Sequence, residues 1–288
     1  MITTALLGNP TSHSVSPHLF SIYAKEHNLE YSHLKIDVEP GRLLRILEAV
    51  KLLGFKGLNI TLPHKSEVIK YLDEIDPQAQ KIGAVNTIVI KGKKLCGYNT
   101  DIYGAVKAIE ERLKREINNK DKSLVIGTGG AARAIIQGLL QRNSSVAVCY
   151  REPKSIRTTS MIKDFNEKVK FIKSSTELVK IISETNIICN ATSAGMFPHV
   201  NELPIKRNYL IEASSQNDFS KKLFFDAIFN PYQTLFLKIA EKLGTKTQGG
   251  TEMMVYQGVV AFELWTGLQV SEKSINLAKK TLKNLLLN

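Results

Sequence analysis

Apolar and polar positions alternate along the first part of the chain with two periods, one typical of strands and one typical of helices. Short apolar runs predict strands at residues 1–8, 31–38, 56–62 and 83–92. Apolar residues at helical spacing predict helices at residues 17–27 and 41–53. Because strands that alternate with helices pair mostly in parallel and are covered by those helices, this pattern indicates an α/β fold.

A second alternation of strands and helices follows residue 101, where a new helical pattern begins. Apolar runs predict further strands at residues 123–127, 144–152, 186–196 and 221–231. The last section, residues 250–288, has the pattern of helices only. We therefore expect one domain at residues 101–239 and another that combines residues 1–100 with residues 240–288.

The sequence around Gly127 has the signature of a dinucleotide-binding turn. Gly127, Gly129 and Ala132 fit the pattern G-x-G-x-x-[G/A] between a predicted strand and a predicted helix. The glycines permit a tight turn and a close approach of the backbone to a pyrophosphate at the helix N-terminus. This interpretation makes residues 101–239 a doubly wound, Rossmann-like domain; a purely structural glycine turn is the alternative.

The end of the next predicted strand bears on which dinucleotide binds. An acidic residue there holds the ribose hydroxyls of NAD, whereas an arginine suits the 2′-phosphate of NADP. This strand ends in Arg151, which Glu152 follows. Arg151 favours NADP and Glu152 would repel its phosphate, while an exposed loop arginine without a ligand is the alternative.

Two serines near the start of the chain, Ser14 and Ser16, stand one residue apart between Pro10 and Pro17. In an extended segment both side chains point the same way, so two hydroxyls can donate to the two oxygens of one carboxylate. The alternative is structural, because a serine directly before a proline is a good helix N-cap.

The segment LNITLPHK places further polar side chains together. Asn59 and Thr61 stand two residues apart in a predicted strand, so both face the same side. Lys65 falls in the first turn of a helix that Pro63 is expected to start, where the helix dipole disfavours a cation. A lysine at such a position is a candidate for acid–base chemistry, and a solvated lysine that tolerates the position is the alternative.

Three other polar positions interrupt apolar elements. Asn86 lies in an otherwise apolar predicted strand, where asparagine is depleted. Asp101 stands at a helix start, where N-capping is the default explanation. Gln257 lies at the margin of the apolar stripe of a C-terminal helix, where a backbone carbonyl would satisfy its amide. For Asp101 and Gln257, each taken alone, the structural explanation is the better one.

The composition of the chain argues against a membrane protein, a secreted protein and a nucleic-acid-binding protein. The chain has 288 residues, of which 43% are hydrophobic and 23% charged, without a run as long as a membrane span or the pattern of a secretory signal. Its cysteines, Cys96, Cys149 and Cys189, lie far apart, which indicates reduced thiols in a cytoplasmic protein and argues against a zinc site. The net charge of +12 comes from scattered basic residues, which favours anionic small molecules over nucleic acid as partners.

Ordered motifs then extend over nearly the whole chain. They are NPTSHSVSPHLF, GLNITLPHK, GAVNTI, GYNTDIYG, GTGGAAR, NATSAGM, NPYQT and GGTEMMVYQ. In this order they resemble the shikimate dehydrogenase family, NADP-dependent reductases of 3-dehydroshikimate in aromatic amino-acid biosynthesis, and such an ordered set is far more specific than any one motif. The resemblance implies a Rossmann-like nucleotide domain inserted in an α/β substrate domain. Hinged closure is our hypothesis for two domains joined in this way.

The resemblance also implies roles for individual residues. Ser14 and Ser16 would bind the substrate carboxylate, and Lys65 and Asp101 would form the catalytic pair. The remaining substrate-binding residues would be Asn59, Thr61, Asn86, Phe229 and Gln257. The cofactor-binding residues would be Gly127, Thr128, Gly129, Gly130, Ala131, Tyr150, Arg151, Thr192, Ala227 and Gly250. NADP is the expected cofactor, with NAD secondary and no metal, in a monomer or homodimer.

Two positions depart from the family pattern. Where the family has Asn-Arg-Thr or Asn-Arg-Ser beside the 2′-phosphate, this chain has Tyr150, Arg151 and Glu152, so we expect a weakened preference for NADP. Where the family has a tyrosine in the segment after Asp226, this chain has Phe229. Because one lost hydrogen bond costs about 1 kcal/mol, we expect weaker substrate binding rather than lost activity.

Two rival functions stay open. A quinate dehydrogenase, or a dual quinate/shikimate dehydrogenase with relaxed use of NAD and NADP, is the nearest one, and the pair Ser14 and Ser16 argues for shikimate. A non-catalytic NADP-binding regulator would keep the glycine turn. It would have no reason to keep Lys65 together with Asp101.

Overall fold

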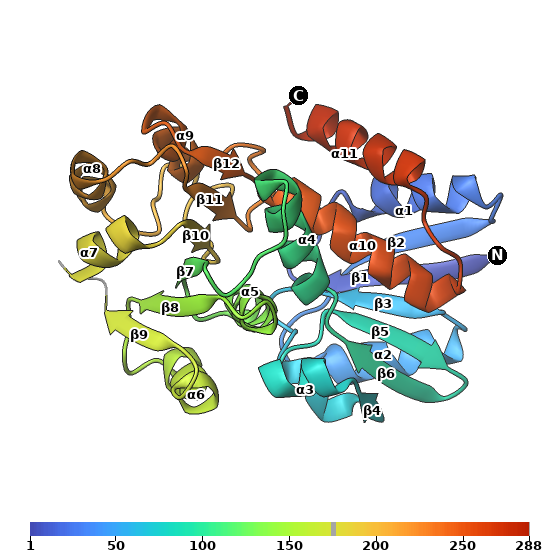
Figure 1. Cartoon of the computed structure of the whole chain (residues 1–288). Helices are drawn as coiled ribbons and strands as arrows, with labels where there is room; N and C mark the ends of the chain where they lie inside the picture. Colours follow the sequence, from blue (N-terminus) through green and yellow to red (C-terminus); the bar gives the residue numbers. More distant parts are fainter. Residues whose placement is uncertain (174–176, 288) are drawn as a thin grey trace. The chain divides into compact units, whose positions relative to one another are not determined.

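The computed structural model describes residues 1–173 and 177–287, and its contacts divide the chain into two compact units. The first unit comprises Met1–Asp101 and Val255–Asn284, and the second comprises Ile102–Met254 with a short piece from Leu285. Both units contain a sheet flanked by helices, which confirms the α/β prediction (Figure 1). We expected residues 240–254 in the first domain. Their contacts lie in the second unit, because β12 (Lys246–Gln248) pairs with β11 (Leu223–Asp226).

The first unit is built on a six-stranded sheet with the order β2-β1-β3-β5-β6-β4. Its strands are β1 (Ile2–Gly8), β2 (Tyr31–Asp37), β3 (Gly57–Ile60), β4 (Glu74–Ile75), β5 (Thr87–Lys91) and β6 (Lys94–Tyr98). The first three strands are parallel, whereas β5 runs antiparallel to both β3 and β6. The hairpin of β5 and β6 turns at Gly92, whose φ of 61° suits glycine. The sheet is therefore mixed.

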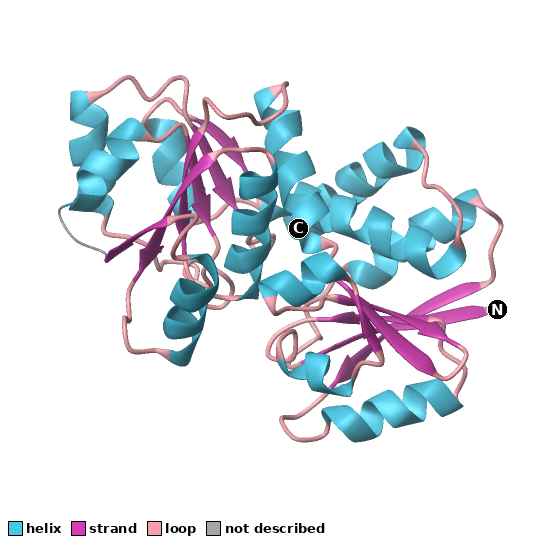
Figure 2. Ribbon diagram, turned by 60° about the horizontal axis from the view of Figure 1, so that its bottom comes forward, coloured by secondary structure: helices cyan, strands magenta, loops and turns pink. Residues whose placement is uncertain are grey.

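Helices cover both faces of this sheet, as Figures 1 and 2 show. On one face lie α1 (Ser16–Glu26), α11 (Glu272–Leu287) and the part of α10 (Gly250–Thr266) that begins at Val255. On the other face α2 (Leu43–Leu52) buries its apolar side chains against the strands. Gly57 makes room for Trp265 on the first face, because a Cβ there would lie 2.0 Å from the indole nitrogen. That nitrogen donates to the Ile88 carbonyl oxygen at 2.9 Å.

The second unit contains a parallel sheet with the strand order β12-β11-β10-β7-β8-β9. Its other strands are β7 (Lys122–Ile126), β8 (Ser145–Tyr150), β9 (Lys170–Lys173) and β10 (Ile187–Asn190). The chain winds outward from β7 to β9 and then resumes on the other side of β7 with β10, so the order reverses between β7 and β10. This is the doubly wound arrangement, in which ligands bind at the carboxyl ends of the strands beside the reversal.

Two groups of helices flank the second sheet. The apolar side chains of α7 (Glu177–Glu184), α8 (Arg207–Gln216) and α9 (Leu235–Lys242) form one core with the strands. The helix α5 (Gly130–Gln141) contacts both α4 (Asp101–Leu113) and α6 (Ile156–Phe165). Gly138 of α5 admits Val106 of α4, and Arg133 of α5 pairs with Asp164 of α6 at 2.7 Å.

The described part of the chain contains neither a membrane-spanning helix nor a metal-binding cluster. Among residues 1–173 and 177–287, no helix has the length and apolarity needed to cross a bilayer. Nor does any group of three His, Cys, Asp or Glu side chains in these ranges have the arrangement to hold a metal ion. The cysteines Cys96, Cys149 and Cys189 are free and buried.

Burial of His33 makes the stability of the first unit depend on pH. His33 on β2 lies 4.5 Å from Phe20 and 6.0 Å from Trp265 between ring centroids, and its Nδ1 is 2.7 Å from Thr4 Oγ1. Burial lowers the pKa of His33 from 6.5 to about 3. Between these two pH values the His33 ring is protonated in the unfolded chain and neutral in the folded protein. The free energy of unfolding is therefore unaffected by His33 above the unfolded pKa. As the pH falls below that value, it declines by about 1.4 kcal/mol per pH unit.

We expect His33→Phe to remove this pH dependence, since the aromatic ring is kept and the titrating group is lost. Between about pH 7 and pH 5, the free energy of unfolding of the variant should fall by about 2 kcal/mol less than that of the natural protein. Urea titrations at the two pH values measure this difference. His199→Phe, at a position 71% exposed, is the control and should change nothing. Equal losses in the natural protein and His33→Phe would contradict the prediction.

Candidate functional site

Loops at the carboxyl ends of β1 and β3 lie side by side in the first unit. The two strands are parallel neighbours, so their carboxyl ends meet at one edge of the sheet. The Asn9 backbone NH donates to the Leu62 carbonyl at 2.9 Å, and a Cβ on Gly8 would lie 2.2 Å from Thr61 Cγ2. The loop that carries Ser14 and the loop that carries Thr61 thus start next to each other.

Ser14 and Ser16 form a pair after β1. The Ser14 hydroxyl donates to the Ser16 hydroxyl at 3.0 Å, and the Ser16 backbone NH donates to Ser14 Oγ at 3.2 Å. Ser16 is the first residue of α1, and the N-cap position belongs to Val15, which makes no side-chain cap. The alternative of Ser16 as an N-cap is therefore wrong, and the two hydroxyls lie together.

Lys65 forms an ion pair with Asp101, the first residue of α4. Its Nζ donates to Asp101 Oδ2 at 2.6 Å, and the two side chains are 20% and 8% exposed. This is a partly buried pair, with the ammonium on the more accessible side. An ammonium held in this way can serve a ligand oxygen as a hydrogen-bond donor or proton donor.

The expected helix at Pro63 does not form, so the helix-dipole argument for Lys65 was wrong. Instead the His64 backbone NH donates to the Thr61 carbonyl in a turn, and a short 3₁₀ helix, η1 (Glu67–Tyr71), follows. The buried His64 ring explains this path, with Nε2 2.7 Å from the Val38 carbonyl and Nδ1 3.2 Å from Glu67 Oε2. Tertiary contacts of His64 therefore position the loop that carries Lys65.

Asn86 connects several of the candidate residues. It lies directly before β5 instead of within it, and its side chain is buried. Its Nδ2 donates to Thr100 Oγ1 and to Asp101 Oδ1, each at 2.9 Å, while its Oδ1 accepts from the Thr100 backbone NH at 2.7 Å. Gln257 of α10 joins through Oε1, at 3.4 Å from Asn86 Nδ2 and 3.2 Å from Thr100 Oγ1. Asn86, Asp101 and Gln257 therefore form one network.

Two threonines in this network were not identified from the sequence. Thr87 Oγ1 donates to Asn86 Oδ1 at 3.1 Å and lies 3.2 Å from Thr100 Oγ1. Asn59 of β3 reaches the same group, with Nδ2 3.3 Å from Thr87 Oγ1. The available signal was the dipeptide Asn-Thr, which occurs in both GAVNTI and GYNTD. Thr61 lies just past the end of β3 and is half-buried.

The glycine turn of the second unit connects β7 to α5. Gly127 has φ of 120°, and a Cβ there would lie 3.0 Å from the Ala191 carbonyl oxygen and from Thr192 Cγ2, so only glycine fits. Gly129 is the N-cap residue of α5, and a Cβ there would meet nothing within 4 Å. The helix N-terminus therefore faces open space, as the close approach of a pyrophosphate requires, and the turn fits a dinucleotide.

The other candidate cofactor residues lie around the same edge of the second sheet. Tyr150 ends β8, and Arg151 follows, 89% exposed, with its Nε 4.0 Å from Glu152 Oε1. The rest lie in the turn after β7, at the start of α5, after β10, after β11 and at the start of α10. They are Thr128, Gly130, Ala131, Thr192, Ala227 and Gly250. Phe229 belongs to the second unit too, half-buried in the segment after β11.

The chain is similar in sequence to known proteins over most of its length. The family model for the shikimate dehydrogenase substrate binding domain matches residues 6–88, and the model for the shikimate 5'-dehydrogenase C-terminal domain matches residues 250–276. The shikimate dehydrogenase (NADP(+)) of Methanocaldococcus jannaschii is 40% identical over 270 residues, which cover 92% of this chain and 91% of that protein.

Solved structures extend the likeness to the fold. A crystal structure of a shikimate dehydrogenase in complex with NADP+ matches with a TM-score of 0.87 at 34% identity, covering 99% of this chain and 96% of that one. The enzyme of Thermus thermophilus in complex with NADP(H) and shikimate matches with a TM-score of 0.84 at 30% identity, covering 98% and 100%. Agreement in sequence and fold over almost the entire length shows that the chain belongs to the shikimate dehydrogenase family.

Proposed function

We propose that this protein catalyses the reversible NADPH-dependent reduction of 3-dehydroshikimate to shikimate. The observation that carries the proposal is the pair of Lys65 and Asp101, joined at 2.6 Å and connected to Asn86. A binding protein or regulator has no use for a proton donor held in this way. Relatives solved with NADP(H) and shikimate support the choice of substrate and cofactor.

Lys65 acts as the general acid in this proposal. NADPH, when bound, supplies the hydride that reduces the C3 ketone. Lys65 donates a proton to the oxygen that develops negative charge, and in the reverse direction it accepts the proton of the hydroxyl. Asp101 hydrogen-bonds the substrate and orients the ammonium of Lys65, while Asn86 fixes Asp101 through Oδ1.

Hydroxyl and amide side chains of the first unit bind the substrate. Ser14 and Ser16 donate to its carboxylate, because their hydroxyls lie together after β1. The ring hydroxyls are bound by Asn59, Thr61, Asn86 and Gln257. A substrate with several hydroxyls and one carboxylate needs a site of this composition. Phe229, which lacks a hydroxyl, weakens binding without abolishing it.

The second unit binds the cofactor. The turn from Gly127 to Ala131 receives the pyrophosphate, since the N-terminus of α5 faces open space at Gly129. Arg151 binds the 2′-phosphate, next to Tyr150, and Glu152 weakens the preference for NADP over NAD. The free, buried cysteines are consistent with a reducing compartment, and we place the enzyme in the cytoplasm.

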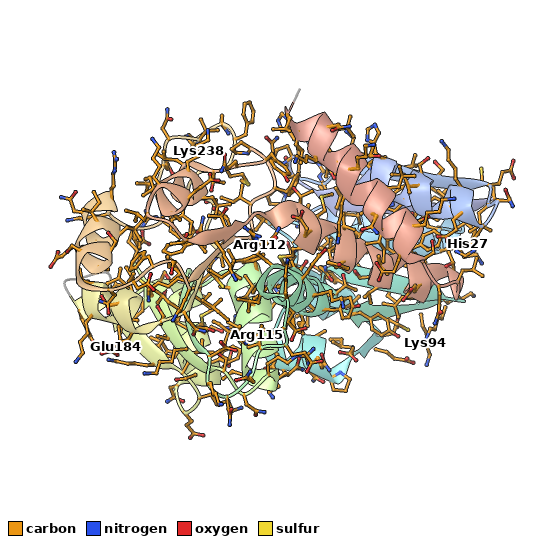
Figure 3. All side chains as sticks on the ribbon, turned by 45° about the horizontal axis from the view of Figure 1, so that its top comes forward. His27, Lys94, Arg112, Arg115, Glu184 and Lys238 are labelled. Carbon is orange, nitrogen blue, oxygen red and sulfur yellow. The ribbon has the colours of Figure 1, made fainter. Side chains whose placement is uncertain are left out.

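Replacement of Lys65 by methionine tests the catalytic assignment. The variant keeps most of the aliphatic chain but loses the proton donor, so kcat should fall about 10²–10⁴-fold while the protein stays folded. Lys94→Met is the matched control, because Lys94 on β6 also forms a 2.6 Å pair, with Glu74, but is 64% exposed (Figure 3). Initial rates of NADP+ reduction by shikimate measure both variants. A folded Lys65→Met enzyme with more than about a tenth of natural activity would contradict the assignment.

Charge changes at the end of β8 test cofactor selection. Arg151→Gln should lower the ratio of kcat/KM for NADP+ over NAD+ by about tenfold or more, because a charge-assisted hydrogen bond to the phosphate is lost. Glu152→Gln should raise the same ratio by removing repulsion. Lys170→Gln, an exposed cation at the opposite end of the neighbouring strand β9, is the control and should leave the ratio unchanged. If Arg151→Gln also leaves it unchanged, Arg151 does not bind the phosphate.

A further inference from the structure

The loops that follow β10 and β11 in the second unit meet at one buried carboxylate, that of Asp226. The glycine turn after β7, the strand on the other side of β10, lies next to the β10 loop. Asp226 ends β11, and its side chain is fully buried. None of the motifs in the sequence gave this residue a role.

The hydrogen bonds that the described residues donate to the Asp226 carboxylate come from neutral groups. Oδ1 accepts from the Ile228 backbone NH at 3.0 Å, and Oδ2 accepts from the Thr234 hydroxyl at 2.7 Å. The Asn190 amide donates to both oxygens at 3.1 Å. Two donors therefore belong to the segment after β11, and the third ends β10. The carboxylate holds the two loops together.

Asn190 carries the connection on to the glycine turn. Its Oδ1 accepts from the Thr192 backbone NH at 3.0 Å and from the Thr192 hydroxyl at 2.8 Å. Thr192 Cγ2 in turn stands 3.0 Å from the position of a Cβ on Gly127. The carboxylate thus determines, through Asn190, where Thr192 lies beside the glycine turn.

We propose that Asp226, acting through Asn190 and Thr234, is a positioning residue that fixes the loops around the cofactor. This inference rests on the proposed function, because it assumes that NADP binds at the carboxyl edge of the second sheet. A carboxylate suits the position because both of its oxygens accept hydrogen bonds. An asparagine would place an NH₂ group among donors and disorganise the loops.

A second buried carboxylate in the same unit provides a matched control. Asp121 lies at the amino ends of the strands, directly before β7, and is 1% exposed. It accepts from Asn186, as Asp226 accepts from Asn190, and Arg115 donates to both of its oxygens (Figure 3). Asn186 directly precedes β10, which Asn190 ends. The two Asp–Asn pairs therefore stand at opposite ends of neighbouring strands, and only Asp226 lies at the proposed cofactor edge.

The test compares Asp226→Asn with Asp121→Asn in the full-length enzyme. Calorimetric titration gives the Kd for NADP+, and initial rates give the KM for shikimate. The assay is run at about pH 8, because burial raises the pKa of Asp226 to about 6 and the carboxylate must be ionised. We expect Asp226→Asn to raise the Kd for NADP+ about tenfold or more with little change in the KM for shikimate. Asp121→Asn should lower the melting temperature and leave the Kd unchanged.

Two substitutions at Thr234 keep the test decisive if Asp226→Asn does not fold. Thr234→Val removes the 2.7 Å hydrogen bond to Asp226 and should raise the Kd about fivefold, whereas Thr234→Ser keeps the hydroxyl and should restore it. An unchanged Kd in folded Asp226→Asn, or in Thr234→Val when only that variant folds, overturns the inference. An equal rise in Asp121→Asn also overturns it, because the effect would then be general loosening. Failure of the natural protein to bind NADP+ would refute the proposed function instead.

Discussion

A buried amide that needs hydrogen-bond partners determines the geometry of the candidate site in the first unit. Asn86 is 3% exposed, so its donors and acceptor depend on protein groups, and an unmet group would cost stability. It meets this requirement with Thr100 and Asp101, which ties the start of α4 to the loop before β5. The orientation of the Asp101 carboxylate follows, and with it the hydrogen bond that Lys65 Nζ donates to Oδ2. The ion pair therefore depends on a neutral side chain.

In the second unit a buried carboxylate, that of Asp226, holds irregular backbone in place. Loops that leave the carboxyl ends of parallel strands lose the regular hydrogen bonds of the sheet, and another group must hold them. Asp226 accepts hydrogen bonds from Asn190, which ends β10, and from Ile228, which follows β11. Asn190 extends the network to Thr192. In both units, a polar side chain beside the end of a strand gives irregular backbone a defined path. Glycine then leaves space that this path needs, as Gly127 does.

Local rules explain what the sequence could predict. The strand at residues 123–127, the glycine turn and the helix after it all follow from neighbours in the chain, and the structure contains β7 and α5 there. The position of Lys65 was misjudged because it depends on the ring of His64, whose contact at Val38 is distant in sequence. Short strands such as β12 have too little pattern to be recognised. The hydrogen bonds of Thr87 and Asp226 join residues that are distant in the sequence, so they arise only in the folded structure.

Because Arg151 and Glu152 are exposed, both can be substituted during evolution with little effect on stability. Side chains that are 89% and 72% exposed carry little of the folding energy, so substitutions there usually alter stability by less than about 0.5 kcal/mol. Asp226 lacks this freedom because it is buried and joins the end of β10 to the segment after β11. Under the role proposed for Arg151 and Glu152, single substitutions there can change the cofactor preference while the framework stays constant. The side chains proposed to select the cofactor and the side chains that hold the fold can therefore evolve at different rates within one domain.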